Sequence, residues 1–143
     1  MTSRAGVALA LAMLCTEAVA AQICSKEEMA NAAAAAAAPR DWDAMYDTFH
    51  RFSPCDHDAV SEKFSASVAY LLASRWDELH ELEYFAEANR SFRAFVLSHI
   101  DATASERDLR RILGHTKGCL AYARPICREI ENRARAALGE PKD

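Results

Sequence analysis

Apolar residues recur three and four positions apart along most of this chain, and no stretch alternates apolar with polar residues as a half-buried strand does. Glycine and proline, which interrupt regular structure, number only four each among the 143 residues. We therefore expect an all-α protein. The links between the predicted elements are short, so we expect a single domain of about six or seven short helices, arranged as an irregular bundle or as helical hairpins.

The first 21 residues have the pattern of an export signal. A positive charge at Arg4 precedes an apolar run over residues 5–15, and the small residues at 18–21 suit a signal peptidase. The apolar run is shorter than the ~20 residues that a membrane-spanning helix needs. We expect residues 1–21 to be removed on export to the periplasm, which leaves residues 22–143 as a helical domain without a membrane segment.

Four of the five cysteines lie outside the predicted signal, and an even number in an exported chain is typical of disulfides. They are Cys24, Cys55, Cys119 and Cys127. Three connectivities are possible, and we favour Cys24–Cys55 with Cys119–Cys127. The gaps between them do not match the ligand spacing of zinc sites. We therefore expect a disulfide-stabilised domain.

Helix starts can be predicted from capping residues. Ser25 and Glu28 have the spacing of a capping box, and the helix they begin should continue through the alanines at 32–38 and stop before Pro39. These alanines either allow a neighbouring helix to approach closely or form a thin outer helix. Asp41 can cap a second helix, whose apolar residues share one face. They are Trp42, Met45, Tyr46, Phe49 and Phe52.

Further along, Pro54 is suited to the first position of a third helix that ends near Ser74. A fourth helix, over residues 75–88, is either continuous with the third or bent from it. Asn89 or Ser91 should begin the fifth. A second capping box is predicted at residues 103–106, with Thr103 as the cap, and Gly118 is expected in the left-handed conformation after the next helix. A last helix should end at residues 138–141.

The helix over residues 75–88 has two different sides. Leu79, Leu82 and Ala86 fall on its predicted inner side. Opposite them lies a set that we name the acidic face: Asp77, His80, Glu81, Tyr84 and Glu87. We consider the acidic face a candidate partner-binding surface. The alternative interpretation is an ordinary solvated helix face.

The sequence contains no recognisable catalytic arrangement. His99 lies within an apolar face, where a histidine is more often a hydrogen-bonded core residue than a ligand. Asp77 precedes His80 by three residues, but no second copy of such a pair supports a metal centre. No glycine-flanked nucleophilic serine and no phosphate-binding loop occur. We expect a protein that is not an enzyme, with no cofactor and no bound metal.

Charge limits the possible partners. The formal net charge is −4, which argues against general nucleic-acid binding. Residues 22–101 contain 7 basic and 14 acidic side chains, whereas residues 102–143 contain 9 basic and 6 acidic ones. Such an uneven distribution can orient a charged protein partner. A second copy of the chain, in a homodimer, is also possible.

Residues 92–103, followed by the sequence Arg-Arg-Ile at 110–112 and the two last cysteines, resemble exported bacterial proteins of the Rap1a/Tai type, which are periplasmic immunity proteins against type VI-secreted peptidoglycan amidases. The similarity extends over roughly residues 53–130 as a pattern. It includes Phe64, Val68, Leu71, Leu72, Trp76 and Leu79. The resemblance implies a helical periplasmic protein that binds a toxin and blocks its active site. The alternative is an envelope stress or metal-binding protein that uses the residues around His80.

Overall fold

The structure, a computed structural model, describes residues 24–141, so the predicted export signal at residues 1–21 lies outside the described residues. The described residues form seven α-helices and three short 3₁₀ helices, and they contain no strand, which confirms the predicted all-α fold. The elements are α1 (Lys26–Ala36), α2 (Trp42–Phe52), η1 (Ser53–Cys55), α3 (Asp58–Ser74), η2 (Trp76–Glu78), α4 (Leu79–Ala88), α5 (Arg90–Ser98), α6 (Glu106–Thr116), η3 (Ala121–Ala123) and α7 (Arg124–Ala137).

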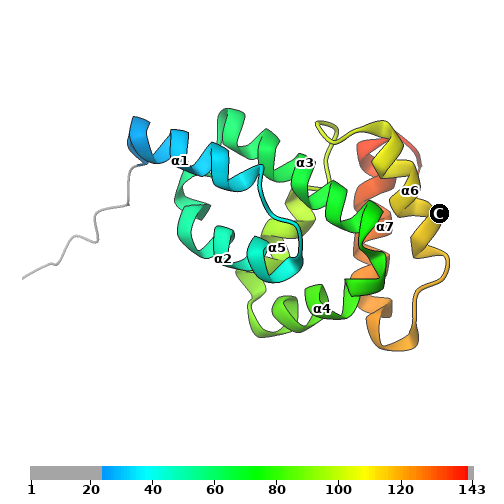
Figure 1. Cartoon of the computed structure of the whole chain (residues 1–143). Helices are drawn as coiled ribbons and strands as arrows, with labels where there is room; N and C mark the ends of the chain where they lie inside the picture. Colours follow the sequence, from blue (N-terminus) through cyan, green and yellow to red (C-terminus); the bar gives the residue numbers. More distant parts are fainter. Residues whose placement is uncertain (1–23, 142–143) are drawn as a thin grey trace, which may run out of the picture.

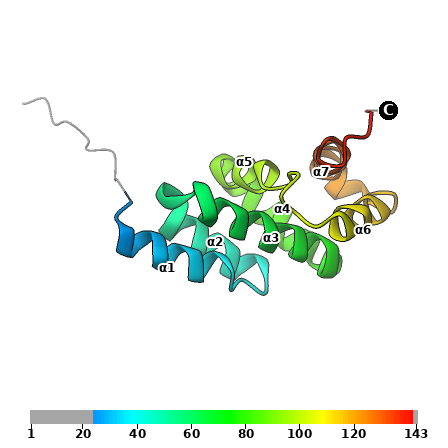
Figure 2. The ribbon, with the colours of Figure 1, turned by 90° about the horizontal axis from the view of Figure 1, so that it is seen from above.

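α3 is the central helix of the arrangement (Figure 1). It packs against α1 over one part of its length and against α6 at its other end. Figure 2 shows α1 and α2 at one end of the molecule and the α6–α7 pair at the other. α5 contacts both α4 and α7 and so links the two ends of the molecule.

The alanine run of α1 allows a close helix contact. Ala32 and Ala36 are fully buried, and the Ser67 hydroxyl of α3 donates a hydrogen bond of 2.6 Å to the Ala36 carbonyl. A larger side chain at either alanine would separate the two backbones. Of the two interpretations of this run, the close approach of a neighbouring helix is therefore confirmed.

Three predicted helix starts are confirmed. The Ser25 hydroxyl accepts from the Glu28 amide while the Glu28 carboxylate accepts from the Ser25 amide, which completes a capping box. Asp41 accepts from the amide of Ala44 at 2.8 Å to cap α2. Asn89 rather than Ser91 caps α5, because its side-chain oxygen accepts from two amides of the first turn.

The predicted start of the third helix at Pro54 is wrong. Pro54 lies in the short helix η1, and α3 begins four residues later at Asp58. Asp58 has a φ of 50°, in the left-handed region that aspartate tolerates better than most residues. This backbone conformation interrupts the helix, while Cys55 is held by a disulfide and Asp56 turns toward His99.

The predicted capping box at residues 103–106 is also wrong. The Asp101 carboxylate accepts from both the amide and the hydroxyl of Thr103, at 2.8 and 2.6 Å, which holds Thr103 in a turn before the helix. Ser105 caps α6 instead and accepts from the Asp108 amide at 3.1 Å. The distant contact between Asp101 and Ser65 fixes this turn, and local sequence carries no sign of it.

Gly118 does not adopt the left-handed conformation that we expected. An added Cβ at Gly118 would meet only the His115 carbonyl oxygen, at 3.8 Å, so the position does not require glycine. Gly139, after α7, does have a positive φ, of 70°. Its amide donates to Ala136, and that of Glu140 donates to Arg135, so the end of the last helix follows the prediction.

The chain bends between α3 and α4. Helix α3 ends at Ser74, and η2 separates it from α4. The His115 ring stacks on Trp76 with ring centroids 5.2 Å apart, and its Nε2–H donates to the Ala73 carbonyl at 3.1 Å. This contact with α6 fixes the bend, which decides between the continuous and the bent alternatives.

The cysteines pair as Cys24–Cys55 and Cys119–Cys127, with Cα atoms 5.2 and 6.4 Å apart. The favoured connectivity is confirmed. The first disulfide joins the segment before α1 to η1, and the second closes the connection between α6 and α7. None of the helices within residues 24–141 combines the length and the apolar character needed to cross a membrane.

Candidate functional site

Core packing determines how α4 is oriented. Leu79, Leu82 and Ala86 are buried, as predicted, against the rest of the helical core. Because residues three and four apart share one side of a helix, this packing turns the opposite side of α4 outward. The acidic face is that outward side.

The structure places all five residues of the acidic face on η2 and α4. Tyr84 is the most exposed large hydrophobic residue in the described part of the chain, at 71%. Asp77, His80 and Glu87 are exposed, and Glu81 is half-buried. The His80 Nδ1–H donates to the Asp77 carbonyl at 3.3 Å, which holds the imidazole near the start of the helix.

A surface depression of about 490 Å³ lies within the acidic face, lined by Asp43, His80, Glu81, Tyr84 and Phe85. Three of these residues were predicted, whereas Asp77 and Glu87 lie outside the lining. Asp43 and Phe85 were missed. Asp43 belongs to α2 and reaches the site only through the contact between α2 and α4, for which the sequence carries no local signal. Phe85 is adjacent to Tyr84, but it was missed because it belongs neither to the predicted inner side of the helix nor to the acidic face.

The apolar wall of the depression is fixed by the core. The Phe85 ring stacks on Tyr46 with centroids 4.5 Å apart, and Tyr46 makes an edge-on contact with the buried Phe92. Tyr84 contacts Phe85 edge-on at 5.4 Å. An exposed tyrosine beside a rigid aromatic wall loses little conformational freedom when it binds a partner.

The surroundings of the depression are negatively charged. Its lining contains two carboxylates and no lysine or arginine. Partial burial raises the pKa of Glu83, and the carboxylate of Glu87 raises this pKa further against the opposing effect of Arg93. Arg93 is itself paired with Glu129. A cationic group of a partner would therefore be attracted to this surface.

A second polar cluster is buried inside the molecule. His99 Nε2 lies 2.9 Å from Asp56 Oδ2, and its Nδ1 lies 3.0 Å from the Ser65 hydroxyl. Ser65 and His99 are 0% and 2% exposed, so a substrate cannot reach them in this conformation. The prediction of His99 as a hydrogen-bonded core residue is confirmed.

The direction of the Ser65 hydrogen bond shows what this cluster can do. The Ser65 hydroxyl donates to Asp101 at 2.8 Å, so it is not available to donate to His99. In a serine nucleophile activated by a neutral histidine, the hydroxyl must donate to the ring. The cluster therefore does not have that pattern, and its contacts join His99 to Asp56 on one side and to Ser65 on the other.

Within residues 24–141, no three His, Cys, Asp or Glu side chains converge as ligands for a metal ion. Comparisons of the chain with protein-family models, with curated proteins and with solved structures find no match.

Proposed function

We propose that this chain is an exported periplasmic binding protein that inhibits a secreted, cell-wall-degrading toxin by covering its active site, and that it catalyses no reaction itself. The observation that carries the proposal is Tyr84, which is 71% exposed beside a depression of about 490 Å³ with two carboxylates in its lining.

The chemistry of the acidic face fits a basic partner cleft. Tyrosine is enriched among the residues that dominate binding energy at protein interfaces, and surrounding carboxylates would steer a positively charged surface toward it. The two disulfides are typical of an oxidising compartment such as the periplasm. The resemblance of residues 53–130 to periplasmic immunity proteins supplies the class of partner.

No specific observation favours the metal-binding alternative. His80 has a backbone carbonyl, not a carboxylate, as its hydrogen-bond partner. A metal site would need further ligands from other elements, and the described residues near His80 do not form such a cluster.

The decisive experiment co-expresses the mature chain with the product of the adjacent reading frame and measures both complex formation and protection of growth. We expect a stable complex and protection. In the complex, Glu81→Lys combined with Tyr84→Ala should weaken the affinity by about thirtyfold or more, because loss of one central tyrosine costs about 2 kcal/mol.

A matched control makes the same two chemical changes elsewhere: Glu62→Lys combined with Tyr122→Ala, two exposed residues that line neither the depression nor the cavity beside Arg40. The control should bind within about twofold of the wild type, since surface changes away from an interface have small effects. Unchanged affinity in the Glu81 and Tyr84 variant, with an unchanged circular dichroism spectrum, would remove the acidic face from the proposal. Absence of both complex and protection would refute the function itself.

A further inference from the structure

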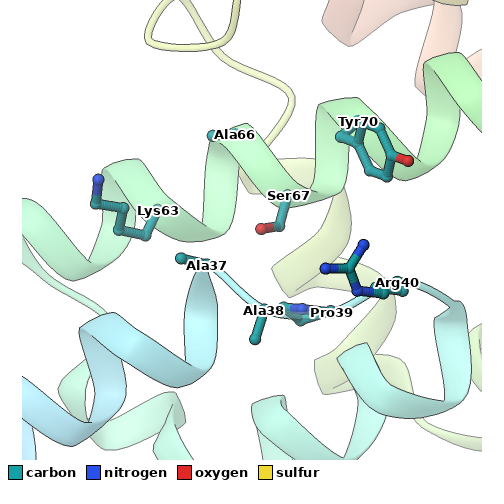
Figure 3. Close-up of a pocket in the computed structure, with 8 residues that line it drawn as sticks. All are labelled: Ala37, Ala38, Pro39, Arg40, Lys63, Ala66, Ser67 and Tyr70. Atoms are coloured by element: carbon teal, nitrogen blue, oxygen red, sulfur yellow. The ribbon is translucent and has the colours of Figure 1, made fainter.

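A second cavity, of about 350 Å³, lies between the α1–α2 connection and the outer side of α3 (Figure 3). Half of its lining residues are small and apolar, and its polar groups come from both sides. The lining residues are Ala37, Ala38, Pro39, Arg40, Lys63, Ala66, Ser67 and Tyr70. The volume falls at the lower end of the range of about 300–1,000 Å³ that is typical of small-molecule sites.

The cavity contains two cations and no carboxylate. The Arg40 guanidinium extends toward α3 near Ser67 and Tyr70 (Figure 3). Neither Arg40 nor Lys63 has an ion-pair partner within residues 24–141, whereas Arg75, Arg93 and Arg110 each pair with a glutamate. A guanidinium that enters a cavity without a carboxylate partner leaves its fork of donors available to a ligand.

We infer that this cavity binds the carboxylate of a small organic acid or of a peptide C-terminus. The two oxygens of a carboxylate match the parallel N–H groups of Arg40. Tyr70, a residue that is 48% exposed, offers its hydroxyl as a further donor. The Lys63 ammonium points away from Arg40 (Figure 3), so it adds positive charge only at the edge of the cavity. The alanines at 37, 38 and 66 leave space for a short apolar body.

Phosphate fits this cavity less well than a carboxylate. Phosphate sites commonly use the free amides of a helix N-terminus. This cavity lies instead beside the end of α1, whose carbonyl oxygens disfavour a doubly charged phosphate more than a singly charged carboxylate. The Ser67 hydroxyl is already committed to the Ala36 carbonyl. The donors are therefore limited to side chains, which suits a singly charged anion.

The test is a titration of the ¹⁵N-labelled mature chain, in low-chloride buffer, with acetate, acetamide, phosphate and trialanine with a free or an amidated C-terminus. We expect acetate and free trialanine to shift the amides of Ala37, Ala38 and Tyr70 in a saturable manner, while acetamide and amidated trialanine leave them unchanged. Tighter binding of trialanine than of acetate identifies a peptide terminus as the ligand, and equal binding identifies a small acid. Either order supports the carboxylate site.

The variant Arg40→Gln should weaken acetate binding at least tenfold, and Lys63→Gln should weaken it less. Arg90→Gln removes one exposed positive charge on α5 and serves as the matched control, which should leave the affinity unchanged. Shifts that do not saturate, tighter binding of phosphate than of acetate, or an Arg40→Gln affinity within twofold of the wild type would each overturn the inference. The result is independent of the proposed inhibitory function, because the cavity and the acidic face share no lining residue.

Discussion

Replacing His99 by alanine tests whether the buried cluster stabilises the fold. His99 is 2% exposed and bonds to Asp56 at 2.9 Å and to Ser65 at 3.0 Å, and its ring centroid lies 4.5 Å from that of Phe95. A hydrogen bond to a charged group contributes about 1.5–3 kcal/mol and a neutral one about 1 kcal/mol. The aromatic contact adds about 0.5–1.5 kcal/mol. We therefore expect a loss of about 3–5 kcal/mol in the free energy of unfolding.

The assay is urea unfolding with both disulfides intact, followed by circular dichroism. His57→Ala is the control, because the His57 side chain is 51% exposed and, among residues 24–141, pairs only with the exposed Asp58. It should cost less than about 0.5 kcal/mol. Asp56→Asn in the His99→Ala background should cost less than in the wild type, since its partner is already absent. A loss below about 1 kcal/mol for His99→Ala, or full additivity of the two changes, would refute the reasoning.

Two further predictions concern acid stability and the disulfides. Burial alone would raise the pKa of Asp101, but hydrogen bonds from Thr103 and Ser65 and the nearby His99 lower it overall. A carboxyl group whose pKa is lower in the folded than in the unfolded state stabilises the protein above its unfolded-state pKa of about 3.9, and this stabilisation is lost as the pH falls through the folded-state pKa. In acid titrations, Asp101→Asn should therefore flatten the decline of the unfolding free energy below about pH 4. The disulfides close loops with sequence separations of 31 and 8, for which chain entropy predicts about 3.7 and 2.5 kcal/mol. In urea unfolding, the variant with Cys24 and Cys55 replaced by serine should therefore be about 1 kcal/mol less stable than the variant with Cys119 and Cys127 replaced by serine. Equal losses of stability would show that chain entropy does not determine the contribution of each disulfide.

Local interactions explain why much of the fold could be predicted. The caps at Ser25, Asp41 and Asn89 act within one turn, so their residue type and spacing were sufficient. The wrong cap at Thr103 has a distant cause, because Asp101 holds Thr103 and is itself bonded to Ser65 of α3. A contact 36 residues away along the chain is not visible in a local pattern.

In the candidate site, too, the local features could be predicted, whereas those that depend on tertiary packing could not. The outward direction of Tyr84 was predictable from the apolar spacing of Leu79 and Leu82 along one helix. The depression beside Tyr84 was not, because Asp43 joins it from α2 through tertiary packing. The cavity at Arg40 likewise needs the α1–α2 connection to lie against α3, and neither segment carries a motif for it.

The contact between α1 and α3 has a consequence for how the alanine run can evolve. Ala32 and Ala36 are fully buried and face α3, whereas Ala30 and Ala34 are exposed and do not line the cavity at Arg40. In a library that randomises these positions, mutational tolerance should follow the helical turn: only glycine or serine should replace the buried pair, while long polar residues should be accepted at the exposed ones. The alanine-rich segment would then contain two positions under strong constraint, Ala32 and Ala36, and exposed positions that can change freely in evolution.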